Sequence, residues 1–356
     1  MKFIEKHINE EIDNAIYAAT YEPSEKIEIP YSESKKLYHY CSLETFYSII
    51  ESNCFWLSHP KFMNDLSELE YAIGITKKFL QEYNQTIDDQ DNSINLLKQI
   101  ESNFELYESV FKGIDEDKYK KLGFFACFSS DGDSLPMWSV YKGKNIGLAI
   151  GLDFSDENYF VDFPVSSDNN SKAEKKSPFY TPPHCYFSDI EYQEDKMQKS
   201  INIFLDHIKR YYNSNQTELN GETNHAKEYL SKVAAYTLIN MSLDLKNSNF
   251  SYEKETRLML FGYKEEDVKF RVRDKFIVPY IEYPLEEKEV EDENKNKIKK
   301  KVKIDKPIIP IKSITISPNA EEPELVKASI WAFLNHKGYK IDKKEIKQSS
   351  IPFKPR

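Results

Sequence analysis

An almost continuous apolar stretch, GFFACFSS at residues 123–130, constrains the fold of this chain more than any other feature. A run of this length between Gly and Ser is typical of a central strand that is buried on both faces. A second strand, NIGLAIGLDF, is predicted at residues 145–154, and its two glycines permit a ligand or a neighbouring backbone to approach closely. We therefore expect a sheet at the centre of the fold.

Helical and strand patterns follow one another without regular βαβ alternation, and there is no glycine-rich phosphate loop. Apolar spacing predicts helices over residues 2–20, 43–53, 64–83, 93–120, 192–213, 221–246 and 322–338. Strands are predicted at residues 25–30, 34–40, 54–58, 123–130, 145–154, 256–261 and 308–317, with a last short one near 349–353. The fold class is α+β, with a central mixed, mostly antiparallel sheet and helical insertions.

The predicted domain organisation has two parts. Residues 1–35 form an N-terminal helical extension, and residues 36–356 form a single α+β domain with a helical insert at 64–120. The polar, proline-flanked residues 164–183 are predicted to be an exposed loop, and the charged residues 288–303 a solvated hairpin tip.

Composition excludes several classes of protein. The formal net charge of −10 and a pI near 5.4 argue against a large basic face for duplex nucleic acid. No stretch reaches the roughly 18 apolar residues of a membrane helix, and acidic residues near the start argue against a signal peptide, so a cytoplasmic protein without a membrane partner is predicted. The four cysteines lack CxxC spacing and are interpreted as reduced core residues; they are Cys41, Cys54, Cys127 and Cys185.

Two clusters combine polar groups with aromatic side chains near predicted strand ends, as binding pockets do. In the first, His39 lies within LYHY and is either a satisfied core residue or a ligand contact. In the second, Trp138 and Tyr141 share a helical face and either cover a flat ligand or plug the sheet. Asp131 and Asp133 in the same cluster form a weak metal signal that a turn explains better.

The third cluster is the segment FSYEKETRLMLF at residues 250–261. Read as one strand, it places Glu253, Glu255 and Arg257 on one side and Leu258 and Leu260 on the other. The acidic row is then either an exposed ion-pair ladder or the lining of a cleft. A cleft would raise the pKa of one carboxylate, while Arg257 would keep the other ionised.

Four ordered motifs resemble the bacterial domain-of-unknown-function family 2971 over about residues 36–355. They are LYHYCSLETFYSIIESNCFWLSHPKFMNDLSELE, ACFSSDGDSLPMWSVYKGKNIGLAIGLDF, FSYEKETRLML and the ending IKSITISPNAEE with SSIPFK. The chain departs from the family pattern at Leu66, Ser67 and Thr256, and between Lys142 and Asn145. These departures bear on substrate contacts more than on the fold.

The opening segment also resembles the first strand and helix of the ADP-ribosyltransferase superfamily, whose members split NAD between nicotinamide and ribose. The resemblance implies a sheet of the ADP-ribosyltransferase type, NAD as the substrate, and His39, Tyr141 (or Ser129) and Glu255 as the matching site residues. It further implies that Glu255 stabilises the oxocarbenium-like state, that His39 binds ribose hydroxyls and that Glu253 receives the acceptor.

The remaining contacts implied for the nucleotide are made by surrounding side chains. Trp138 or Tyr141 stacks on nicotinamide and Arg257 orients the carboxylates or meets a phosphate. The other contacts are Tyr40, Ser42 and Asn64. The acceptor of ADP-ribose is water or a macromolecule, either protein or nucleic acid, and the oligomeric state is left open. By analogy, an enzyme of this kind in a Lys-, Asn- and Ile-rich chain fits phage defence or a toxin.

Two other functions are compatible with the same residues. One is a non-catalytic module that binds a nucleotide or a partner through Glu253, Glu255 and Arg257. The other is a metal-dependent nuclease that uses Asp131, Asp133 and Glu255, against which the acidic charge balance argues.

Overall fold

The structure is a computed structural model of the whole chain. It describes residues 36–63, 66–112, 123–141, 146–154, 184–220, 225–261, 263, 265–273, 275–284, 286–291, 297–302 and 309–352. The predicted helix 2–20, the strand 25–30 and the loop 164–183 lie outside these residues.

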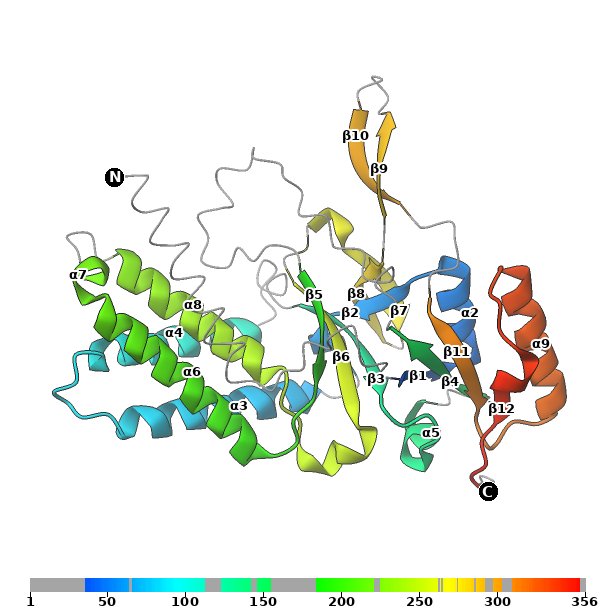
Figure 1. Cartoon of the computed structure of the whole chain (residues 1–356), viewed down its shortest axis with the longest axis horizontal. Coiled ribbons are helices and arrows are strands. Elements are labelled where there is room, and N and C mark those ends of the chain that lie inside the picture. Colours follow the sequence, from blue (N-terminus) through cyan, green and yellow to red (C-terminus); the bar gives the residue numbers. More distant parts are fainter. Residues whose placement is uncertain are drawn as a thin grey trace.

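A ten-stranded sheet runs through the middle of the described chain (Figure 1). The path of paired strands is β12-β11-β4-β1-β3-β2-β8-β7, and β6 pairs with both β3 and β5. All of these pairs are antiparallel except β11 with β12, which is parallel. The bounds are β1 Lys36–Ser42, β2 Phe55–Ser58, β3 Phe124–Ser129, β4 Gly147–Asp153, β5 His184–Asp189, β6 Glu255–Phe261, β7 Lys269–Arg273, β8 Phe276–Tyr283, β11 Ile311–Ile316 and β12 Ile346–Gln348. The α+β class with a mixed, mostly antiparallel sheet is thus confirmed.

Helices lie on two sides of this sheet (Figure 1). The α-helices are α2 Leu43–Ser52, α3 Leu66–Gln85, α4 Ile94–Lys112, α5 Leu135–Tyr141, α6 Glu194–Ser214, α7 Gln216–Leu219, α8 His225–Ser242 and α9 Pro323–His336. Short 3-10 helices are η1 Pro60–Phe62, η5 Ser248–Glu253, η6 Glu265–Asp267 and η7 Lys343–Glu345. Helix α2 begins at the N-cap Ser42, whose hydroxyl accepts from the Thr45 N–H, and ends at Asn53 in the left-handed conformation.

The side chains of β6 alternate between two separate cores. Met259 packs with α3, α4, α6 and α8, whereas Leu258 and Leu260 pack with α2 and α9. The alternation is that of any strand, but here every residue of β6 is buried. The predicted central strand at residues 123–130 is likewise covered on both sides, because Phe125 belongs to the first core and Phe124 to the second.

Some boundaries differ from the predicted ones. The last strand is β12 at residues 346–348, where it pairs with β11, and the segment 349–353 predicted for it comes after. The charged residues 288–303 contribute to a separate two-stranded sheet, β9 Glu286–Glu291 with β10 Lys297–Val302, which projects from the body (Figure 1). Glu253 is not on a strand, since it ends η5.

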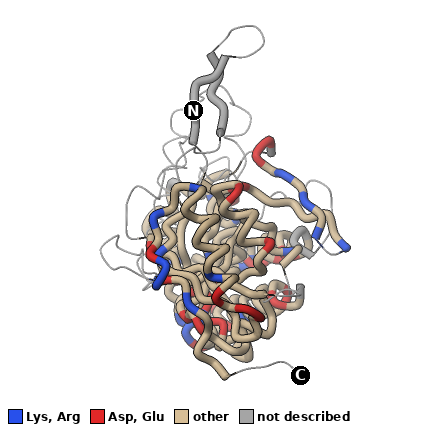
Figure 2. The backbone as a smooth tube through the Cα atoms, turned by 90° about the vertical axis from the view of Figure 1, so that its right-hand side faces the viewer, with Lys and Arg blue, Asp and Glu red and all other residues tan. Residues whose placement is uncertain are grey.

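The backbone trace coloured by residue type shows Lys and Arg positions as well as Asp and Glu positions on the side of the molecule turned toward the viewer (Figure 2). None of the helices in the described ranges combines the length and apolar character needed to cross a membrane.

Candidate functional site

Five charged side chains meet in one buried cluster, here called the acidic centre. Glu68 comes from α3, Lys246 from the segment after α8, Glu253 from the end of η5, and Glu255 and Arg257 from β6. The Lys246 Nζ lies 2.6 Å from Glu253 Oε2, 2.8 Å from Glu255 Oε2 and 3.2 Å from Glu68 Oε2. The Arg257 Nε donates to Glu255 Oε1 at 2.7 Å, and its Nη2 pairs with Glu68.

The local backbone explains how Glu253 and Glu255 reach the same cation. Helix η5 ends at Glu253, Lys254 then adopts a left-handed conformation with φ of 44°, and β6 begins at Glu255. Because a left-handed residue turns the chain sharply, both carboxylates point to Lys246 although only Glu255 is on the strand. The hydroxyl of Ser129 fixes the turn by donating to the Glu253 carbonyl at 2.6 Å.

The two carboxylates have opposite pKa shifts. Burial alone would raise the pKa of Glu255, but the charges of Arg257 and Lys246 and the hydrogen bond from Arg257 hold it well below its usual range. For Glu253 burial is the largest cause, and with the charges of Glu255 and Glu68 it raises the pKa despite Lys246. The cluster thus contains one firmly ionised carboxylate beside one that takes up a proton more readily, the separation that acid/base chemistry uses.

Neutral groups complete the acidic centre. The Tyr192 hydroxyl accepts from the Glu255 N–H at 2.9 Å, and the Cys127 thiol hydrogen-bonds the Glu255 carboxylate. Burial, followed by the charge of Glu253, raises the pKa of the Tyr141 hydroxyl, which is therefore a neutral donor at physiological pH. Tyr141 is half-buried, so part of its side chain reaches solvent at the rim of the acidic centre.

A small cavity adjoins the acidic centre on the side of Arg257 and Glu68. Its volume of about 20 Å³ is enough for about one water molecule. Apolar side chains from η1, α3 and the segment after α8 form most of its wall, together with Phe125. The exposed fractions of Glu253 and Glu255 are only 7% and 5%.

His39 lies on the opposite face of the sheet from Glu255. Tyr38 pairs with Ser129, which in turn pairs with Glu255, so Tyr38 shares their face and His39 projects away from it. The imidazole packs against Phe55 and Phe128 and its Nδ1 donates to the Cys127 carbonyl at 2.9 Å. Burial lowers its pKa. The predicted meeting of His39 with Glu255 is therefore corrected, and the core interpretation of this histidine matches its surroundings.

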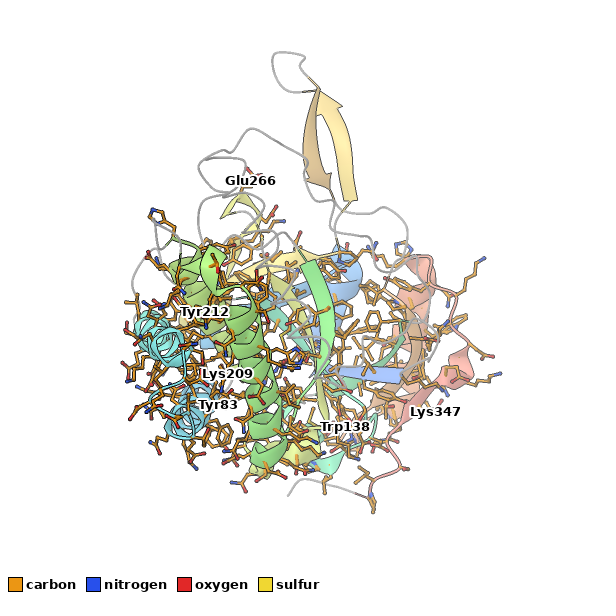
Figure 3. The ribbon with its side chains drawn as sticks, turned by 60° about the vertical axis from the view of Figure 1, so that its left-hand side comes forward. Tyr83, Trp138, Lys209, Tyr212, Glu266 and Lys347 are labelled. Carbon is orange, nitrogen blue, oxygen red and sulfur yellow. The ribbon has the colours of Figure 1, made fainter. Side chains whose placement is uncertain are left out.

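Trp138 packs against the sheet, and its ring is buried. Its exposed fraction is 1%, its Nε1 donates to Asp133 at 2.9 Å, and its ring meets Tyr40 edge-on at 4.8 Å. It belongs to α5 and lies away from Tyr83 and Tyr212 of the helical side (Figure 3). Of the two aromatics predicted to stack on a ligand, only Tyr141 has accessible surface beside the carboxylates.

The other predicted nucleotide contacts do not join the acidic centre. Tyr40 donates to the Asp131 carbonyl at 2.8 Å, and Ser42 caps α2. Asn64 lies outside the described residues.

Asp131 and Asp133 have structural partners. Asp131 forms a salt bridge with Lys254 at 3.0 Å, and Asp133 accepts from Trp138 and from Ser349 at 2.6 Å. In the ranges that the structure covers, no group of three or more His, Cys, Asp or Glu side chains is arranged to hold a metal ion.

Sequence reasoning missed three members of the acidic centre: Glu68, Lys246 and Tyr192. Glu68 lies within the first of the four family motifs, and Lys246 lies shortly before the 250–261 segment, but nothing in the sequence placed either of them beside Glu255. Tyr192 lies in none of the motifs. One physical rule could have pointed to Lys246: two buried carboxylates require a further cation in addition to Arg257.

The fold and the acidic centre define a class: an α+β protein in which a sheet covered on both sides carries a buried cluster of ionised side chains. The family described as "protein of unknown function (DUF2971)" matches residues 137–258, a stretch that includes Lys246, Glu253 and Glu255. This match supports the predicted resemblance to that family. No curated protein and no solved structure matches the chain significantly.

Proposed function

We propose that the acidic centre cleaves the nicotinamide–ribose bond of NAD, with ADP-ribose passed to water or to a macromolecule. The observation that carries this proposal is the pair of carboxylates, Glu253 and Glu255, whose pKa values are shifted in opposite directions within one buried cluster. The resemblance of the opening segment to the ADP-ribosyltransferase superfamily supplies the substrate. His39, which the sequence predicted for this site, has no role in the reaction because it lies on the other face of the sheet.

The roles follow from the charges. As the bond to nicotinamide breaks, its electron pair leaves with the neutral base, and positive charge develops on the ribose. Glu255, kept ionised by Arg257 and Lys246, stabilises that charge. Glu253 accepts the proton of the attacking water or acceptor hydroxyl, and the Tyr141 hydroxyl donates a hydrogen bond at the rim.

The test is to incubate the pure protein with NAD and measure nicotinamide release, with DNA, RNA and protein added separately as acceptors. Glu253→Gln should reduce release by about 10²-fold or more, since a general base contributes about that much. Glu228→Gln removes an exposed carboxylate of α8 and should change nothing. If the wild type releases no nicotinamide with any acceptor, NAD cleavage is wrong.

A second function is favoured by a specific observation: both carboxylates are already ion-paired, and the adjoining cavity has room for only about one water molecule. These features suit a non-catalytic module in which the acidic centre holds η5 and α3 against β6. If the protein is such a module, the concentration of NAD should stay unchanged under all of the conditions above.

A further inference from the structure

The edge strand β7 and the adjoining end of β8 present an apolar surface to solvent. Strand β7 is the last strand of the sheet path, and among the described strands it pairs only with β8. The register places Val272 opposite Ile277, and Phe270 lies two residues from Val272, so the three side chains share one face. The exposed fractions are 58% for Phe270, 80% for Val272 and 67% for Ile277. These three side chains are here called the edge patch.

The edge patch continues a face of the sheet that is covered elsewhere. Ile281 of β8 lies on the same face as Ile277 and is fully buried in the core against α2 and α9. Toward the end of the hairpin this cover stops, while the side chains remain apolar. An exposed apolar row on a strand whose outer edge pairs with no described strand is typical of an interaction site.

The charges around the edge patch are positive. Lys269 and Arg271 lie on the opposite face of β7, and Lys275 is exposed in the turn of the hairpin. Within the described chain, only Lys269 of these three has a carboxylate partner, Glu282 at 2.6 Å. Arg271 instead stacks over Trp56, with its Cζ 5.0 Å from the ring centroid. In a chain with a formal net charge of −10, this hairpin therefore attracts a partner that carries carboxylates.

A second copy of this chain and a membrane fit the edge patch less well. When two β7 strands pair about a two-fold axis with the apolar side chains on one face, the cations of both strands share the other face and repel each other. An open sheet edge that enters lipid would leave backbone N–H and C=O groups without partners. An added acidic strand has neither cost, because it pairs with the backbone groups and brings carboxylates to the cations.

We infer that β7 binds an extended segment of a partner protein as an additional strand of the sheet. The segment alternates apolar and acidic residues, because successive side chains of a strand point to opposite faces. Its apolar side chains extend the edge patch, and its carboxylates lie on the side of Lys269 and Arg271. This inference does not depend on NAD cleavage, because it uses none of the residues of the acidic centre.

The experiment measures binding of fluorescein-labelled peptides by fluorescence anisotropy at constant ionic strength. The probe is a peptide in which glutamate and valine alternate, and the comparison peptide has lysine in place of glutamate. The glutamate peptide should bind at least about tenfold more tightly, because Arg271 and Lys275 attract carboxylates and repel lysine. Binding of neither peptide, or equal binding of both, would overturn the proposal.

Val272→Glu tests the edge patch, because it places a carboxylate at the most exposed of the three apolar positions. It should weaken binding of the glutamate peptide by about tenfold or more. Val140→Glu is the matched control, since it makes the same substitution at an exposed valine of α5. It should leave the affinity within about twofold. Equal losses in the two variants would mean that the peptide does not bind at β7.

Pairing through the backbone is tested on the peptide, so this comparison needs no variant of the protein. The N–H groups of alternate residues point to the same side of a strand. Methylation of the amides of all valines, or of all glutamates, therefore blocks one edge of the added strand. One of these two methylated peptides should lose binding and the other should keep it. Loss in both or in neither contradicts strand addition.

Two further measurements address the other occupants. Sedimentation should give the same mass for the wild type and Val272→Glu, and vesicles of phosphatidylglycerol should bind neither protein. A dimer that dissociates in Val272→Glu would assign the edge patch to a second copy of the chain. Vesicle binding that is lost in Val272→Glu would assign it to a membrane. Either result overturns the proposal.

Discussion

Among individual residues, Glu255 and Glu253 have the same side chain but different surroundings. Glu255 accepts hydrogen bonds from two cations and a thiol, while Glu253 shares only Lys246. A buried ion pair is costly to form, and removal of one partner leaves an uncompensated charge. Removal of Glu255 should therefore cost more stability at neutral pH than removal of Glu253.

Glu255→Gln should lower the free energy of unfolding by about 3 kcal/mol at pH 7, because Arg257 and Lys246 lose their shared anion. Glu253→Gln should lower it by less than Glu255→Gln does, because burial opposes the charge of Glu253 and raises its pKa. Urea unfolding of both variants provides the measurement.

The pH dependence of the free energy of unfolding provides the control for these two variants. A lowered folded-state pKa means that the contribution of Glu255 is present above the unfolded value of about 4.3 and is lost as the pH falls toward the folded value. The difference between the wild type and Glu255→Gln should shrink on acidification below about pH 4. A difference that stays constant would contradict the ion pairs.

At the scale of the element, glycine positions distinguish a free helix surface from a packed strand. A Cβ on Gly74 of α3 would meet nothing within 4 Å. A Cβ on Gly123, just before β3, would lie 2.9 Å from the Leu260 carbonyl oxygen and 2.7 Å from the Phe261 ring. The backbone oxygen cannot move aside without shifting β6.

Gly74→Ala should raise the free energy of unfolding by about 0.5–1 kcal/mol through helix propensity. Gly123→Ala should lower it by about 1–3 kcal/mol through overpacking at the junction of β3 and β6. Thermal or urea unfolding measures both, and a stabilising Gly123→Ala would show that this junction is looser than described.

At the scale of the whole molecule, the sheet separates His39 from the acidic centre. The imidazole belongs to the core against α2 and α9, and Glu255 faces the side of α3 and α8. The order and register of the strands set this separation, so no rotation of a side chain closes it.

His39→Leu should therefore leave nicotinamide release per folded molecule unchanged if the acidic centre cleaves NAD. It should lower the free energy of unfolding by about 1 kcal/mol, because the hydrogen bond to the Cys127 carbonyl is lost. A folded His39→Leu protein that has lost an activity present in the wild type would return the imidazole to the site.

The α+β class, the buried strand at residues 123–130 and the placement of Glu255 and Arg257 on the opposite face of a strand from Leu258 and Leu260 could all be predicted from the sequence. These follow from local rules, because a strand repeats every two residues and a helix every 3.6. The face of the sheet that His39 occupies, the neutralisation of Glu255 by Lys246 and the pairing of Glu68 with Arg257 are fixed only in the folded molecule. The register between β1, β3 and β6 and the position of α3 depend on contacts between residues that are far apart in the sequence, such as Tyr38 with Ser129 and Ser129 with Glu255, and no local pattern encodes these contacts.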